Sequence, residues 1–259
     1  MTDSILTRPG AQLAYSISGD GPIVVSAHAM TMSRAVAAET GQGFARLAQC
    51  DRTVVEYDAR GHGRSTGALV ADDYTWQSLA DDLLALMDEV SPDAPVDAIG
   101  ASMGCATILH AVLRAPERFR RLVLVIPPTA WETRAAIASG YEQIARLVEQ
   151  DGVDALIRLD ATVPNPPAVP ADLVLRTDIS DELIPTVFRG AALSDLPPRV
   201  ELASIAQPTL ILAWVGDPGH PTSTSEGLLA LLPHAGLRVA QSPEQVEEWV
   251  ALADAFLGG

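Results

Sequence analysis

The segment Gly100-Ala101-Ser102-Met103-Gly104 carries the strongest chemical signal in the sequence. A short apolar run at residues 96–99 precedes it and an apolar helical pattern at 103–113 follows it. In that context G-x-S-x-G indicates a serine nucleophile on a sharp strand-to-helix turn, which strains the serine backbone and therefore needs small flanking residues. The turn lifts the hydroxyl clear of the sheet and leaves it near a helix N-terminus. There the backbone N–H of Met103 can stabilise an oxyanion.

Short runs rich in Val, Ile and Leu alternate with longer helical patterns along the chain. The runs predicted as buried strands are residues 23–27, 53–57, 96–99, 122–126, 209–214 and 237–239, and residues 11–18 predict an edge hairpin before them. Helical patterns cover residues 74–90, 103–113 and 243–257. This alternation predicts an α/β fold, with a mostly parallel sheet of up to eight strands and helices on both faces.

The alternation stops at residues 134–207, which contain helical patterns and a Pro-rich stretch at 164–170 but no convincing buried strand. Such a block between two core strands is typical of a helical cap over a site. The predicted organisation is therefore a core of residues 1–133 and 208–259 with a cap insertion of residues 134–207.

Several motifs together resemble the α/β-hydrolase superfamily, in its capped branch of small esterases and lactonases. The segments that carry the resemblance are the Ser102 motif, residues 22–30, the turn Tyr57-Asp58-Ala59-Arg60-Gly61-His62-Gly63-Arg64-Ser65, residues 74–83, and residues 115–124. The resemblance implies an α/β-hydrolase fold with Ser102 as the nucleophile. It also implies an oxyanion hole made by the backbone amides of Met30 and Met103, with Ala29 in place of the usual glycine. His28 and His62 are interpreted as structural.

An acidic turn follows the apolar run at residues 209–214, at the strand end where ligands bind in open α/β sheets. It resembles the acid loop of the superfamily, which makes Asp217 the expected acid of a catalytic triad. The order of Ser102 before Asp217 is the one that the superfamily uses.

The catalytic histidine of the superfamily has no counterpart at its usual place after the last strand. Residues 240–243 lead directly into the final helical pattern, and no histidine follows His234. A serine hydroxyl is a poor nucleophile without a base. We therefore expect no imidazole within about 3.2 Å of the Ser102 hydroxyl, and only a small loss of activity when Ser102 becomes alanine.

Three interpretations of this departure stay open. In the first, the chain is an enzyme with an incomplete triad that uses its oxyanion hole for non-hydrolytic chemistry such as cyclisation, elimination or isomerisation. In the second, it is a serine ester hydrolase in which another histidine replaces the base. His220, three residues after Asp217, is then the best candidate, although one turn need not bring it to Ser102. In the third, it is a non-catalytic protein that binds a small ligand.

The substrate expected from the resemblance is a small, largely apolar carbonyl, ester or lactone compound. Its pocket is predicted to lie between Ser102, the Met30 loop and the cap. The residues predicted to line it are His28, Ala29, Trp131, Tyr141, Phe188 and Leu193.

The composition excludes other classes of protein. The chain has 259 residues, of which 48% are hydrophobic and 19% charged, so it is not of the disordered class. Its net charge of −16 disfavours nucleic acid and anionic membranes as partners. The sequence shows no signal peptide and no apolar run long enough to span a membrane, so we expect a cytoplasmic protein, either a monomer or a homodimer. It also shows no phosphate-binding loop and no metal-ligand spacing, so we expect that it needs no cofactor or metal.

Overall fold

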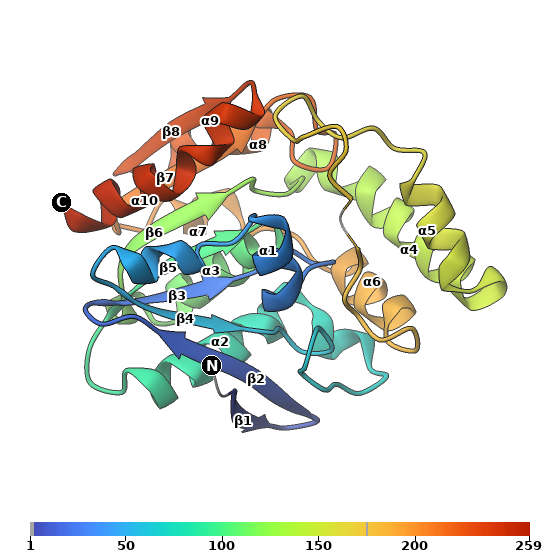
Figure 1. The fold of residues 1–259 in the computed structure, drawn as a ribbon, viewed down its shortest axis with the longest axis horizontal. Helices are drawn as coiled ribbons and strands as arrows, with labels where there is room; N and C mark the ends of the chain where they lie inside the picture. The colour runs from blue at the N-terminus through green and yellow to red at the C-terminus, as the bar shows by residue number, and fades with distance from the viewer. Residues whose placement is uncertain (1–2, 175) are drawn as a thin grey trace.

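The computed structural model describes residues 3–174 and 176–259, which build one sheet with helices on both faces (Figure 1). The strand order is β1-β2-β4-β3-β5-β6-β7-β8. The strands are β1 (Ser4–Arg8), β2 (Ala11–Ser18), β3 (Ile23–Ala27), β4 (Thr53–Tyr57), β5 (Val96–Ala101), β6 (Phe119–Val125), β7 (Thr209–Trp214) and β8 (Ala235–Ala240). β1 pairs with β2 and β2 with β4 in antiparallel fashion, and the other neighbours are parallel.

Helices connect the parallel strands, because a crossover between parallel strands needs a dozen or more residues. They are α1 (Arg34–Thr40), α2 (Trp76–Val90), α3 (Met103–Arg114), α7 (Arg199–Leu202), α8 (Thr222–Leu231), α9 (Pro243–Glu247) and α10 (Trp249–Gly258). Short 3-10 helices lie at η1 (Ala45–Gln49), η2 (Ala71–Tyr74), η3 (Pro116–Arg118) and η4 (Trp131–Thr133). No helix within residues 3–174 and 176–259 is long and apolar enough to cross a bilayer.

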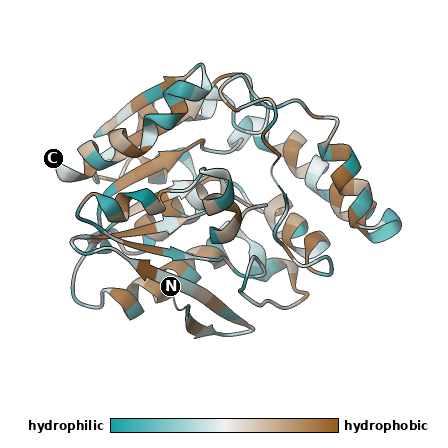
Figure 2. Ribbon diagram, in the orientation of Figure 1, coloured by the Kyte–Doolittle hydropathy of each residue, from teal (hydrophilic) through white to brown (hydrophobic). Residues whose placement is uncertain are grey.

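Two apolar clusters hold the layers together, one on each face of the sheet. One face packs against α2, α3, α7 and α8, and the opposite face packs against η1 and α10. The central strands are hydrophobic along their length, because both of their faces are covered (Figure 2). The predicted α/β-hydrolase fold, with an eight-stranded and mostly parallel sheet, is thus confirmed.

The segment between β6 and β7 forms helices that extend beyond the carboxyl end of the sheet (Figure 1). They are α4 (Arg134–Asp151), α5 (Val153–Asp160) and α6 (Ile184–Ala192). Tyr74 of η2 joins buried side chains of α4, α5 and α6 in a third apolar cluster. The described part of this segment contains no strand, only an isolated bridge between His62 and Ile179.

Candidate active site

Ser102 occupies a strained turn between β5 and α3. Its φ of +49° and ψ of −108° lie outside the regions that residues with a side chain normally adopt. The two glycines of the motif are required by close backbone contacts. A Cβ on Gly100 would lie 2.4 Å from the backbone of Gly104, and one on Gly104 would lie 2.1 Å from the carbonyl oxygen of Ala27. Small residues at these positions let the turn form and hold the Ser102 hydroxyl at the carboxyl end of the sheet.

The structure brings Ser102, His220 and Asp217 into one hydrogen-bonded chain. The Nδ1–H of His220 donates to Oδ2 of Asp217 over 2.7 Å. The unprotonated Nε2 then accepts from the Ser102 hydroxyl, also over 2.7 Å. The prediction that no imidazole would lie within hydrogen-bond reach of Ser102 is therefore wrong. The base does not come from the segment after β8, its usual place in the superfamily, but from the turn after β7.

A tight turn makes this pairing possible, because Asp217, Pro218, Gly219 and His220 close on themselves. The N–H of His220 donates to the carbonyl oxygen of Asp217 over 3.2 Å, and the N–H of Gly219 donates to the Asp217 carboxylate over 2.8 Å. Pro at the second and Gly at the third position are typical of a β-turn. This Asp-Pro-Gly-His pattern was the available signal that both side chains would project from one turn toward the nucleophile.

The Asp217 carboxylate is held in its ionised form. Burial raises its pKa, but hydrogen bonds from His220, Trp214 and the Gly219 N–H together with the charge of His220 outweigh burial and lower the pKa to about 2. Trp214, the last residue of β7, donates its indole N–H to Oδ2 of Asp217 over 2.9 Å. Sequence reasoning missed this contact, since Trp214 was interpreted only as part of a strand.

We expect Asp217→Asn to lower the free energy of unfolding by about 2 kcal/mol at pH 7. This value follows from the pKa of about 2 in the folded protein and 3.8 in the unfolded chain. Because the folded-state pKa is the lower one, the stabilisation is complete above pH 4 and disappears as the pH falls toward 2. Urea unfolding of both proteins at pH 7 and at pH 3 measures it. A difference that does not shrink on acidification would show that the charge of Asp217 is not stabilising.

The backbone N–H groups of Met30 and Met103 are the predicted donors of the oxyanion hole. Within residues 3–174 and 176–259, neither the N–H of Met30 nor that of Met103 has a hydrogen-bond partner in the protein. The carbonyl oxygen of Met30 is contacted by Nε2 of His62, which fixes the orientation of the loop. These free donors are the ones that the predicted oxyanion hole requires.

His28 and His62 have no contact with Ser102. Nδ1–H of His28 donates to the carbonyl oxygen of Ala29, and its Nε2 accepts from the N–H of Ala59. Burial, with the neighbouring His62, lowers the pKa of His28 to about 4, and burial lowers the pKa of His62 as well. The His28 ring is therefore neutral at physiological pH, and the two rings tie the loop after β3 to the turn after β4.

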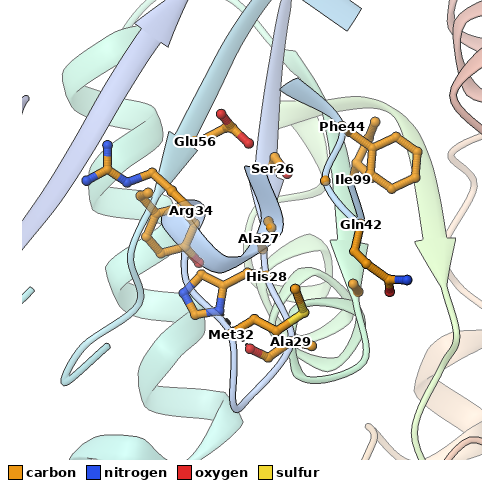
Figure 3. Close-up of a pocket in the computed structure, with 14 residues that line it drawn as sticks. Ser26, Ala27, His28, Ala29, Met32, Arg34, Gln42, Phe44, Glu56 and Ile99 are labelled. Carbon is orange, nitrogen blue, oxygen red and sulfur yellow. Dashed lines mark hydrogen bonds between the residues drawn. The ribbon is translucent and has the colours of Figure 1, made fainter. Parts of the chain in front are cut away.

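A cavity lies beside β3, and residues of the loop after β3 and of α1 line it (Figure 3). His28, Ala29 and Met32 lie at one end of it, and Ser26 and Glu56 lie toward the other (Figure 3). Its wall includes Ala101, the residue before Ser102. His28 and Ala29 line this cavity, but Ser102, Met30 and the described residues of 134–207 do not, so it is not the pocket predicted between the nucleophile and the cap.

The remaining residues predicted to line the pocket separate into two groups. Tyr141 and Phe188 meet edge to face with ring centres 5.7 Å apart, and Met30 packs against the same cluster. Trp131 does not join this pair. Its indole N–H donates to the carbonyl oxygen of Pro197, and the Arg199 guanidinium lies over its ring, 4.3 Å from the ring centre. Leu193 is 63% exposed, and its place in the pocket stays a prediction.

The segment between α5 and α6 passes from the acid turn to the Met30 loop. Pro167 lies so close to Gly216 that a Cβ on that glycine would be 2.8 Å from the proline ring. Further along, the N–H of Asp178 donates to Thr31 over 3.0 Å, and its carbonyl oxygen accepts from Gly63 over 2.8 Å. This segment therefore contacts both the loop that carries the base and the loop that carries the Met30 amide.

Two further titratable groups of α3, His110 and Cys105, make no side-chain contact with the Ser102 hydroxyl. His110 contacts the carbonyl oxygen of Asp195, and Cys105 is a buried free thiol whose pKa burial raises. Among the residues that the structure describes, no group of three or more His, Cys, Asp or Glu side chains is arranged to hold a metal ion.

Comparison with known proteins agrees with the fold. The family model described as "alpha/beta hydrolase fold" matches residues 22–147. The 3-oxoadipate enol-lactonase 1 of Acinetobacter baylyi is 27% identical over 224 residues, which cover 83% of this chain and 79% of that protein.

Two solved structures superpose over nearly the whole chain. A hydrolase from Pseudomonas aeruginosa PA01 has a TM-score of 0.82 and 24% identity, covering 99% of this chain and 98% of the other. A thermophilic esterase from Thermogutta terrifontis has a TM-score of 0.78 and 20% identity, again covering 99% and 98%. At these identities the structural matches establish the fold.

Proposed function

The chain has the α/β-hydrolase fold, and on this premise we propose that it is a serine hydrolase that cleaves small ester or lactone substrates. The observation that carries the proposal is the chain of two 2.7 Å hydrogen bonds, from the Ser102 hydroxyl to His220 and from His220 to Asp217. It supplies the base that a serine nucleophile needs. Similarity to an enol-lactonase and the fold shared with an esterase support the choice of ester and lactone chemistry.

In the proposed mechanism, the Ser102 oxygen attacks the substrate carbonyl carbon while Nε2 of His220 takes the hydroxyl proton. Asp217 stabilises the imidazolium that forms and keeps the Nδ1–H of His220 directed at its carboxylate. The N–H groups of Met30 and Met103 bind the oxyanion. His220 then returns the proton to the leaving alcohol, which departs from an ester and stays tethered in a lactone. Water, activated by His220, hydrolyses the acyl-enzyme and restores Ser102.

The surroundings of the site support a small and largely apolar acyl group. Tyr141 and Phe188 form an apolar cluster with Met30 on the side of α4 and α6. We therefore propose short acyl chains or small rings as substrates, with no cofactor in the reaction.

We expect the protein to hydrolyse p-nitrophenyl acetate and simple γ- and δ-lactones, with short acyl chains preferred over chains of ten carbons or more. The measurement is steady-state kinetics across this panel, followed by mass analysis of the acid formed in H₂¹⁸O. Incorporation of one ¹⁸O atom from solvent indicates hydrolysis. A product isomeric with the substrate and free of ¹⁸O would indicate non-hydrolytic chemistry, and binding without conversion would indicate a ligand-binding protein.

A further inference from the structure

We propose that Trp214 is a positioning residue for catalysis, holding the Asp217 carboxylate in the orientation that keeps His220 against Ser102. This inference rests on the proposed function. Trp214 ends β7 and is buried, and its indole N–H reaches Oδ2 of Asp217 at 2.9 Å. The hydrogen bond joins a rigid strand directly to the acid of the candidate triad.

The same carboxylate oxygen serves both neighbours. Oδ2 of Asp217 accepts from Trp214 and from Nδ1–H of His220, while Oδ1 accepts from the N–H of Gly219 over 2.8 Å. Three donors on two oxygens fix the plane of the carboxylate, because rotation about the side chain breaks at least one of the bonds. The Trp214 ring also meets the His220 ring edge to face, with centres 6.4 Å apart.

The turn needs such an anchor because the acid and the base share it. Asp217 and His220 lie outside any helix or strand, and both are only partly buried. In this turn a single displacement moves both catalytic side chains at once. Besides Ser102, Trp214 is a buried side chain to which this turn is hydrogen-bonded, and the N–H of Thr129 also donates to the carbonyl oxygen of Gly219 over 3.0 Å. The position of Trp214 therefore contributes directly to the position of the Asp217 carboxylate.

Trp214 packs against the C-terminal helix. Its ring stacks on Trp249 of α10 with centres 5.8 Å apart and an angle of 19° between planes. Ala168 and Val169, from the segment that follows α5, belong to the same buried cluster. The C-terminal part of the chain thus contributes to the site by bracing Trp214, although it carries no histidine after β8.

The test compares Trp214→Phe with the unaltered protein, because phenylalanine keeps an aromatic ring and removes the N–H donor. Loss of a hydrogen bond to a charged group predicts a kcat for p-nitrophenyl acetate about 10- to 100-fold lower, with KM changed less than about threefold. The acidic limb of the kcat/KM profile is expected to move to lower pH, because a carboxylate that is no longer held against the Nδ1–H of His220 stabilises the imidazolium less. His220 is the titratable side chain in contact with Asp217.

A double-mutant cycle separates positioning from general packing. If Trp214 acts through the charge of Asp217, Trp214→Phe costs less than about threefold in an Asp217→Asn background. An equal loss in both backgrounds, or a kcat and pH profile unchanged by Trp214→Phe alone, would overturn the proposal. Circular dichroism and thermal melting confirm that each variant is folded.

A measurement that does not depend on substrate hydrolysis distinguishes failure of this proposal from failure of the proposed function. The titration of the His220 ring followed by NMR, assigned with His220→Gln, is expected to shift in Trp214→Phe. A shift in a protein that hydrolyses no ester would support the anchoring of the pair while contradicting the hydrolase. An unshifted titration in an active hydrolase would contradict the role of Trp214 alone.

Discussion

Replacing Ser102 by alanine is expected to lower kcat/KM for p-nitrophenyl acetate by about 10,000-fold or more. The reason is that Ser102 has a base within 2.7 Å and therefore acts as a nucleophile that forms a covalent intermediate. A serine without a base would serve only as a hydrogen-bond donor, and its loss would cost about tenfold or less. The two expectations differ by three orders of magnitude, so steady-state kinetics separates them easily.

The control for this substitution is Ser91→Ala. Ser91 is also a buried serine, but its hydroxyl donates to the carbonyl oxygen of Ala94 at the end of α2. Ser91→Ala is expected to leave kcat within about twofold, since no group of the site is touched. If Ser102→Ala retains a tenth or more of the activity, the serine is not the nucleophile.

Replacing His220 by alanine is expected to reduce kcat by a similar factor, about 10,000-fold or more, with KM nearly unchanged. His220 takes and returns the proton in both halves of the proposed reaction, so its removal disables acylation and deacylation together. Because serine and base act as a unit, Ser102→Ala with His220→Ala is expected to lose hardly more than either single variant.

His234→Ala is the matched control, because that histidine is exposed in the loop before β8. It is expected to keep full activity. Added imidazole is expected to restore part of the activity of His220→Ala by occupying the space of the missing ring, and to leave Ser102→Ala inactive. Full activity in His220→Ala would mean that another group activates Ser102.

The strands and the nucleophile turn were predictable from the sequence because their signals are local. Runs of Val, Ile and Leu bounded by Gly, Pro and Asp located β3, β4 and β7 within a residue at each end. The glycines around Ser102 are dictated by contacts between β3, β5 and α3, which any chain with this turn must make. Local composition therefore carries this part of the fold.

The base was missed because its identification depends on the conformation of one turn. His220 was recognised as the best substitute, but three residues of separation from Asp217 did not reveal whether the ring would reach Ser102. The Pro218-Gly219 pair closes the turn, and Trp214 sets its direction through a contact that sequence spacing does not encode.

The segment between α5 and α6 shows a second limit. Its proline content predicted a loop near the site, yet its contacts with Gly216 at one end and Thr31 at the other depend on tertiary packing. For the same reason Tyr141 and Phe188 came together while Trp131 packed against Arg199 instead. An apolar residue in a cap pattern does not by itself indicate which surface it faces.

Labelling by a fluorophosphonate tests most directly whether His220 makes Ser102 a nucleophile, because the reagent reports activation of the serine without knowledge of the natural substrate. Intact mass measured over time in the unaltered protein, Ser102→Ala and His220→Ala gives the rate of adduct formation. We predict one adduct per chain on Ser102, none in Ser102→Ala, and labelling slowed at least about a thousandfold in His220→Ala. An unlabelled native protein, or equal labelling rates with and without His220, would contradict the account.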